Sequence, residues 1–384
     1  MRNYTIGSVW GIPIRINISL LVFLPVLAWL LGSGEQIDVY TGVVNGFTPT
    51  ALDPAVLNAG NAPWLIGAGA AVGLFASVGV HELGHAWAAR RYGIETDSIT
   101  LWILGGLASL REMPREWHKE FWIAIAGPAA SVLVAAACYA VVAVLPSSVP
   151  VVTFVFGWLV VTNLVLTVFN LLPAFPMDGG RILRALLSRS RPYASATQTA
   201  ARIGSLFALG FAVVGVLSFS PMLLLLAVFV YGAANGESRH VALATLLEGV
   251  TAGDVVTGAF DPVAADASVE TLLDRMMTER RTEFPVVDDD GTVVGVVSIA
   301  DVRRVKNRDS AETTVGEILR EGASRVSADT DAFEVLGLLN TGKTAIVVVE
   351  DAGEPIGVLT RTDFTAALDI RRAGGGPVSP RTAM

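Results

Sequence analysis

The chain has little charge and almost no cysteine. Charged residues make up 16% of its 384 residues and hydrophobic residues 52%, a balance too apolar for an ordinary soluble protein. The one cysteine, Cys138, excludes an internal disulfide, and its apolar surroundings indicate a packing residue. Only three of the 27 basic residues are lysine, a bias that a salty cytosol and a GC-rich genome would both produce.

The charge that is present is unevenly divided. Residues 1–236 contain 12 basic and 10 acidic residues, a net charge of +2, whereas residues 237–384 contain 15 and 25, a net charge of −10. All eight tryptophans lie in the first part. A membrane domain followed by an acidic soluble domain explains this division, and we expect no nucleic-acid partner.

Six apolar stretches are candidate membrane spans, although the last two are close to the ~17-residue lower limit. They cover residues 16–32, 63–89, 121–145, 151–172, 203–218 and 221–236. The first lacks a convincing cleavage site behind it, so we interpret it as a helix rather than a signal peptide. Residues 98–110 are too short to span. Their β-branched start and Gly105-Gly106 favour a strand and a turn close to the membrane.

Basic residues alternate with the spans and predict the orientation. Residues 33–62, 146–150 and 219–220 contain no Lys or Arg, whereas every segment between them does. Positive residues collect on the cytoplasmic side of a membrane. Both termini should therefore be cytoplasmic, and 33–62 should be a long outer loop, to which we assign no role.

The acidic tail contains an internal repeat with an offset of 62 residues. The segment from Pro285 to Asp301 aligns with the segment from Val347 to Asp363. Each copy is predicted to run helix, strand, glycine turn, strand, helix. The expected domains are the membrane domain 1–236, a linker 237–248, α/β units 249–308 and 309–372, and a flexible tail 373–384.

The residues His81-Glu82-Leu83-Gly84-His85 lie inside an apolar stretch. On a helix, His81 and His85 share a face and can bind one metal, with Glu82 beside them. Ionisable groups in such a stretch are costly and indicate function. The pattern is typical of a zinc site in which the glutamate is the general base.

A catalytic zinc needs a third protein ligand. The other two histidines, His118 and His240, lie at membrane boundaries, and Asp178 is the only acidic residue between Glu120 and Glu237. With His81 and His85, Asp178 would leave a fourth position open for water. The alternative is that Asp178 only caps the helix that follows it.

Two motifs together resemble the site-2 protease family of intramembrane zinc metalloproteases. They are His81-Glu82-x-x-His85 and a later segment that contains Asn170, Pro173, Pro176, Asp178 and Gly179. Gly105-Gly106 and Ala126-Gly127-Pro128 also resemble family features. The tail resembles a tandem pair of CBS domains, so the chain as a whole resembles the six-helix subgroup with C-terminal CBS domains.

This resemblance implies a polytopic helical membrane domain with short membrane-proximal strands and one Zn²⁺ per chain held by His81, His85 and Asp178. Glu82 would take a proton from water and pass it to the leaving amine. The substrate would be a transmembrane protein, cut within or near its span after local unwinding. The strand at 98–104 could hold the unwound segment.

Other residues have weaker expected roles. Asn170 could orient the substrate amide or only bond between helices, and Gly127 could serve close helix packing. Gly105 and Gly106 are candidates for substrate positioning but fit a turn better.

In the tail, four residues stand where CBS domains contact the ribose of an adenosine ligand: Ser298, Asp301, Thr360 and Asp363. The alternative is that each aspartate or hydroxyl only caps the helix that follows. The CBS pair could also form a homodimer.

Two functions follow. The first is an intramembrane endopeptidase with its active site near the cytoplasmic side of the cell membrane, modulated by the CBS pair. The second is a CBS-regulated transporter or channel with a non-catalytic metal site. A transporter would place polar residues along several spans, but here the ionisable groups concentrate at one site. The sequence therefore favours the protease.

The orientation can be tested with single cysteines in a chain whose Cys138 is replaced by alanine. Thr50→Cys should react with a membrane-impermeant thiol reagent added to intact cells, because 33–62 is predicted to lie outside. Ser310→Cys should react only after lysis. The opposite pattern would reverse the predicted orientation.

Overall fold

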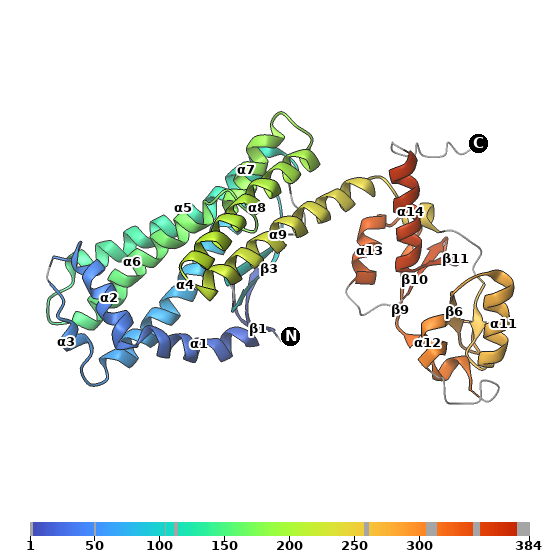
Figure 1. Ribbon diagram of the computed structural model, residues 1–384, viewed down its shortest axis with the longest axis horizontal. Helices are drawn as coiled ribbons and strands as arrows, with labels where there is room; N and C mark the ends of the chain where they lie inside the picture. Colours follow the sequence, from blue (N-terminus) through green and yellow to red (C-terminus); the bar gives the residue numbers. More distant parts are fainter. Residues whose placement is uncertain are drawn as a thin grey trace. The chain divides into compact units, whose positions relative to one another are not determined.

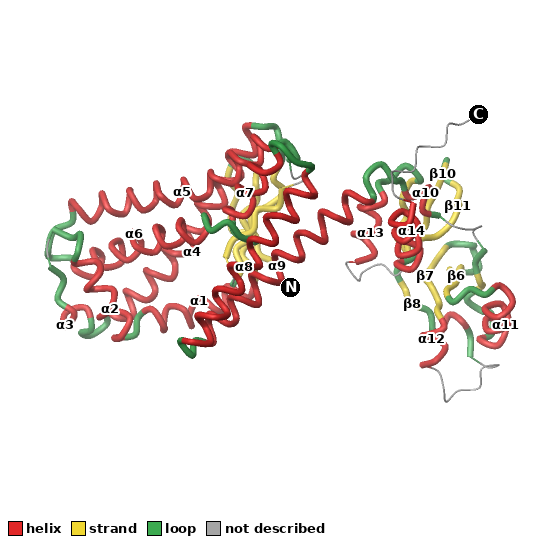
Figure 2. The backbone as a smooth tube through the Cα atoms, turned by 45° about the horizontal axis from the view of Figure 1, so that its top comes forward, coloured by secondary structure: helices red, strands yellow, loops and turns green. Residues whose placement is uncertain are grey.

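The computed structural model has two compact units, Met1–Arg239 and His240–Met384, traced in Figures 1 and 2. It describes residues 3–49, 51–103, 105–110, 114–256, 261–304, 313–340 and 346–374.

The first unit is a helical bundle with five helices that are long and apolar enough to cross a membrane among the described residues. These are α4 (Ala62–Arg91), α5 (Trp117–Val144), α6 (Pro150–Asn170), α8 (Tyr193–Leu217) and α9 (Pro221–Leu246). A sixth span could be formed by α1 (Ile18–Leu31) and α2 (Gly34–Asn45), which are bent by 70° at their junction. The polytopic helical fold is thus confirmed. Helix α9 continues through the segment that we expected to be a linker.

Residues 33–62, which the sequence predicts to be a long outer loop, contain two helices. They form α2 and the short helix α3 (Pro54–Leu57), and the side chains of Ile37, Val44 and Leu57 are fully buried. These side chains share a core with Phe154 and Trp158 of α6. Their apolar residues recur periodically without a continuous hydrophobic run, so a search for membrane spans does not find these helices.

A mixed four-stranded sheet accompanies the bundle, in the order β1 (Asn3–Val9), β2 (Ile12–Asn17), β3 (Thr96–Trp102) and β4 (Gly105–Leu110). Strand β2 is parallel to β3, and the other two pairs are antiparallel. The strands and α7 (Asp178–Ser188) lie at one end of the bundle, and α3 lies at the other (Figures 1 and 2).

The sheet order corrects the expectation for residues 98–104. Strand β3 pairs with β2 on one side and β4 on the other, so its backbone groups are already used and cannot accept a substrate strand. The edge strands of this sheet are β1 and β4, and β4 is the one beside β3.

The second unit consists of two α/β repeats, as predicted. The first contains β5 (Val263–Ala264), α11 (Val269–Glu279), β6 (Glu283–Val287), β7 (Val293–Ser298), α12 (Ile299–Arg304) and β8 (Arg320–Glu321). The second contains β9 (Ala323–Ser327), α13 (Ala332–Asn340), β10 (Ile346–Asp351), β11 (Glu354–Leu359) and α14 (Arg361–Gly374). Gly291 and Gly353 form the predicted turns with φ of 78° and 89°, angles that glycine adopts without strain.

The repeats exchange their leading segments. The short helix α10 (Ala252–Val255) packs into the core of the second repeat, with Val335 and Leu339. The 3₁₀ helix η1 (Val315–Glu317) instead packs into the core of the first repeat, where Val315 is buried with Leu272. The two repeats therefore complete each other, and a boundary drawn along the sequence does not separate their cores.

Candidate metal centre

His81, His85 and Asp178 meet inside the helical unit. The histidines lie one turn apart on α4, Asp178 is the first residue of α7, and all three are buried. Asp178 Oδ2 lies 3.1 Å from His81 Nε2 and 3.2 Å from His85 Nε2, and the two Nε2 atoms are 3.2 Å apart. Ligands of a tetrahedral zinc at 2.0–2.1 Å are about 3.3 Å from one another. The spacing of these three atoms fits that geometry.

Gly127 of α5 supplies a second test of whether a metal fits. A Cβ atom at this position would lie 2.2 Å from His85 Nε2 and 2.8 Å from His81 Nε2. Any larger residue would therefore overlap the ring of His85 and crowd the Nε2 atom of His81. The glycine thus lets both rings keep the spacing that suits a metal, a closer constraint than helix packing alone.

Asp178 does not act only as a helix cap. The N-cap residue of α7 is Met177, and no side-chain bond caps this helix. The second carboxylate oxygen of Asp178 lies 3.8 Å from Arg181 Nη1. The other two histidines lie elsewhere: His118 faces Glu116, and the ring of His240 contacts Phe333.

Glu82 lies against the edge strand β4. The backbone N–H of Ala108 donates to Glu82 Oε2 at 3.1 Å. A Cβ atom at Gly106 would lie 2.4 Å from Glu82 Cγ, whereas one at Gly105 would meet nothing within 4 Å. The structure therefore brings Gly106 to the glutamate and leaves Gly105, with a φ of 133°, to the turn.

Two polar groups of the bundle escaped the sequence analysis. Asn163 is buried on α6 and donates from Nδ2 to Ser77 Oγ of α4 at 3.1 Å. Ser77 is one turn before His81, so this bond joins α6 to the helix with the metal motif. A lone amide in an apolar stretch was the available signal. Asn170, which the sequence singled out, is a half-buried residue at the end of α6.

The second group is Arg184 of α7, which is fully buried. Its Nε donates to Glu120 Oε1 of α5 at 2.8 Å, and its Nη1 donates to Glu237 Oε1 of α9 at 2.5 Å. The guanidinium also lies over the rings of Phe175 and Tyr193. A buried cation requires such partners. Arg184 thereby fixes α7, and with it Asp178, to α5 and α9.

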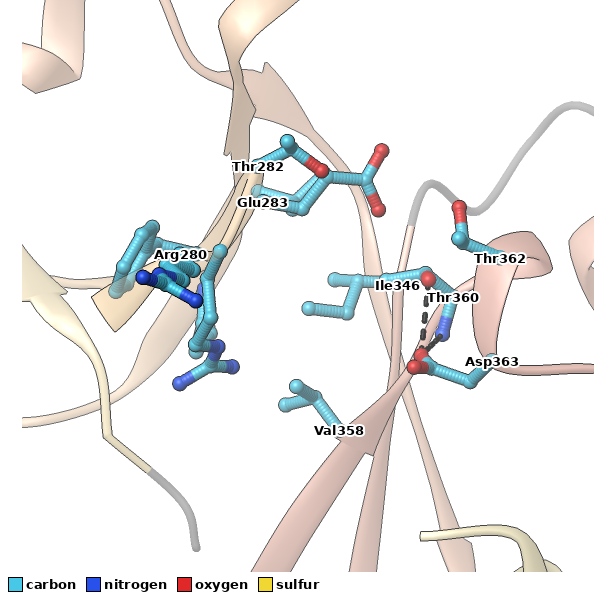
Figure 3. A pocket seen from close by; sticks show the side chains of 12 residues that line it. Arg280, Thr282, Glu283, Ile346, Val358, Thr360, Thr362 and Asp363 are labelled. Carbon is cyan, nitrogen blue, oxygen red and sulfur yellow. Dashed lines mark hydrogen bonds between the residues drawn. The ribbon is translucent and has the colours of Figure 1, made fainter. Parts of the chain in front are cut away.

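In the second unit, a cavity of about 300 Å³ lies between the two repeats. Arg280, Arg281 and Glu283 line it from the first repeat, and Thr360 and Asp363 line it from the second (Figure 3). Asp363 Oδ2 accepts hydrogen bonds from the backbone N–H and the hydroxyl of Thr360, at 2.8 and 2.9 Å. Its other carboxylate oxygen is not used in these bonds.

The equivalent pair in the first repeat has other surroundings. Asp301 Oδ2 accepts from the N–H and hydroxyl of Ser298 at 2.9 and 2.5 Å, and also from Arg320 Nε at 3.1 Å. Asp301 is 2% exposed, and neither it nor Ser298 is among the described residues that line the cavity. Both aspartates thus bond to the residue before their helix, as the capping interpretation predicted, but of the two only Asp363 lines this cavity in the described part of the chain.

Comparisons with known proteins agree with both units. The model of peptidase family M50 matches residues 69–152 and 147–211, and the CBS domain model matches residues 252–308 and 315–370. A zinc metalloprotease of Methanocaldococcus jannaschii is 33% identical over 96% of this chain and 97% of its own. Rip3 of Mycobacterium tuberculosis is 32% identical over 96% of this chain and 93% of its own.

A solved structure of a site-2 protease from Methanocaldococcus jannaschii is also similar. It is 32% identical, covers 62% of this chain and 96% of its own, and has a TM-score of 0.41. The identity to the metalloprotease of Methanocaldococcus jannaschii runs over almost the full length of both chains. Together with the two matching family models, it establishes the relationship. The chain therefore belongs to the site-2 proteases of peptidase family M50, which are zinc metalloproteases, and its second unit is a tandem pair of CBS domains.

Proposed function

We propose that this protein is an intramembrane zinc endopeptidase that hydrolyses a peptide bond within or near a transmembrane segment of a protein substrate. The observation that carries the proposal is the convergence of His81, His85 and Asp178 within 3.2 Å of one another inside an apolar bundle. Among the described residues, this is the one group of three such side chains spaced for a metal. A transporter with a structural metal would need no neighbouring base, but Glu82 is present.

The residues divide the chemistry among them. His81, His85 and Asp178 would hold one zinc, which would polarise the scissile carbonyl and lower the pKa of water at its open position. Glu82 would take the proton from that water and deliver it to the leaving amine. The N–H of Ala108 would orient the Glu82 carboxylate for both transfers.

Strand β4 is suited to hold the unwound substrate. As the edge strand it has backbone groups that β3 does not use, and an extended peptide can add to such an edge. Glu82 lies against this strand, so a peptide that paired with it would pass close to the base. Asn170 remains a proposed contact to the substrate amide.

The proposed orientation places both termini and the active site on the cytoplasmic side. His81 and His85 lie in the last turns of α4, which ends at Arg90 and Arg91. Basic residues at this end favour the cytoplasmic face. Water would reach the site from that face.

For the CBS pair we propose an adenosine nucleotide in the cavity beside Asp363. The free carboxylate oxygen of Asp363 would accept from a ribose hydroxyl, and Arg280 and Arg281 would attract phosphate. Asp301 is already paired with Arg320, so the packing supports only the Thr360–Asp363 half of the expected site. This cleft would let nucleotide modulate cleavage. A homodimer formed through the CBS pair remains part of the proposal.

The base role predicts a separation between metal binding and activity. Glu82→Gln should retain about one zinc per chain and lower cleavage at least ~100-fold, because general-base catalysis contributes 10²–10⁴. Asp178→Ala should lose both zinc and cleavage. Zinc content measures the first effect, and accumulation of uncut proteins in the membrane proteome measures the second. Glu35→Gln, on an exposed turn of α2, is the control. Normal cleavage by Glu82→Gln would contradict the role.

The space beside Gly127 predicts a second effect on the metal. Gly127→Ala should lower zinc occupancy well below one per chain, because the methyl group would overlap the space next to both Nε2 atoms. Gly210→Ala is the matched control, since a Cβ atom there meets nothing within 4 Å. Full zinc occupancy in the Gly127→Ala protein would place the metal elsewhere.

The difference between the two aspartates predicts an asymmetric nucleotide site. Calorimetric titration of the full chain with AMP, ADP and ATP should give one binding event per chain. Asp363→Ala should weaken it by at least about tenfold, because the ribose hydroxyl loses its acceptor. Asp301→Ala removes the same cap bond and should leave the affinity nearly unchanged. Equal losses in both variants would mean two working half-sites, and no binding in the wild type would exclude a nucleotide.

A further inference from the structure

The second ring nitrogen of each histidine in the metal centre has a partner on α5. His85 Nδ1 lies 2.7 Å from the backbone oxygen of Ile123. His81 Nδ1 lies 2.9 Å from the hydroxyl of Ser131, a residue with no exposed surface. We propose that Ser131 is a positioning residue of the metal centre, whose hydroxyl orients His81 and sets which of its nitrogens can bind the metal.

The rings of both histidines turn the same nitrogen toward Asp178. Both Nε2 atoms point to Asp178 Oδ2 and to each other, so Nε2 is the ligating atom in both histidines. A neutral imidazole carries its proton on one nitrogen only. For Nε2 to offer a lone pair, Nδ1 must carry the proton and donate it. Ser131 Oγ is therefore an acceptor when the metal is bound.

The two histidines differ in how firmly this tautomer is fixed. A carbonyl oxygen can only accept, so Ile123 requires a hydrogen on His85 Nδ1, which excludes the neutral tautomer that could not ligate through Nε2. A hydroxyl can accept or donate. Ser131 therefore also permits the other tautomer of His81, in which Nε2–H donates to Asp178 Oδ2 across 3.1 Å. Ligation by His81 Nε2 thus requires Ser131 to act as an acceptor, whereas the metal-free protein does not fix the tautomer of His81.

The position of Ser131 on α5 supports this role. Ser131 and Gly127 are one turn apart on the same face of the helix, and Gly127 borders the Nε2 atoms of both histidines. One face of α5 therefore both opens the metal space and orients a ligand. Partners of this kind, beyond the ligands themselves, contribute 10–100-fold to metal affinity in other sites.

The competing interpretation is that Ser131 only satisfies a buried polar group between helices. A structural role would change the stability of the metal-free protein, whereas a positioning role changes the affinity for metal. Ser205 provides the matched control, because its hydroxyl bonds within its own helix, to the backbone oxygen of Ala201 at 3.0 Å.

The test uses the full chain purified in detergent as wild type, Ser131→Ala, Ser131→Thr and Ser205→Ala. Zinc affinity is measured by competition with a chelator, and ligand geometry by the visible spectrum of the Co²⁺ form. Ser131→Ala should weaken zinc binding about 10–100-fold and alter the Co²⁺ spectrum, with little change in the melting temperature of the metal-free protein. Ser131→Thr keeps a hydroxyl and should restore both properties, and Ser205→Ala should match the wild type.

The outcomes separate this inference from the proposed function on which it rests. Wild-type zinc affinity in Ser131→Ala, with zinc lost in Asp178→Ala, would overturn the role of Ser131 and leave the metal centre standing. Failure of the wild type to bind zinc would overturn the centre itself. If Ser131→Ala does not fold, Ser131→Cys gives the same comparison with nearly the same volume and a weak acceptor. Wild-type affinity in that variant would then overturn the proposal.

Discussion

Polar groups in this bundle have to find partners inside the protein, because the surrounding lipid offers none. Helix α7 satisfies two such demands at once. Asp178 at its start meets His81 and His85 of α4, and Arg184, less than two turns later, meets Glu120 of α5 and Glu237 of α9. The arrangement fixes a short helix between three long ones, and a buried charge cluster thereby holds Asp178, the proposed third metal ligand, in place.

A close contact also joins Glu82, the proposed base, to the sheet. Glu82 follows His81 on α4, yet its carboxylate bonds to the backbone of the edge strand β4. Gly106 allows the close approach, since a side chain there would overlap the glutamate. A peptide that is hydrolysed in a membrane must first lose its helical hydrogen bonds, and a strand edge can replace them. The fold therefore places an edge for the extended chain beside the group that would act on it.

The CBS pair follows another principle, because each repeat is incomplete alone. The segments α10 and η1 pack into the repeat to which they do not belong by sequence. This exchange makes the pair one unit, but its two equivalent aspartates are not equivalent in space. Asp301 accepts a hydrogen bond from Arg320, whereas Asp363 faces the cavity. A repeat in sequence therefore does not imply equivalent surroundings for its matching residues.

The sequence by itself determined the two-part architecture, the strand and turn at 98–110 and the tail repeat, because these depend on local periodicity. Rare ionisable groups in apolar stretches likewise singled out His81, His85 and Asp178 as the proposed metal ligands. The sequence also contains a signal that we did not use: the alternating Ile12, Ile14 and Ile16 indicate the strand β2. Only the tertiary structure decided which residues support the site. Ser131 and Arg184 look ordinary in the chain, and the sequence could mark Gly127 and Asn163 without showing what they contact. All four contacts join helices that are distant in sequence. No local pattern specifies such contacts, since they depend on which faces of the helices meet.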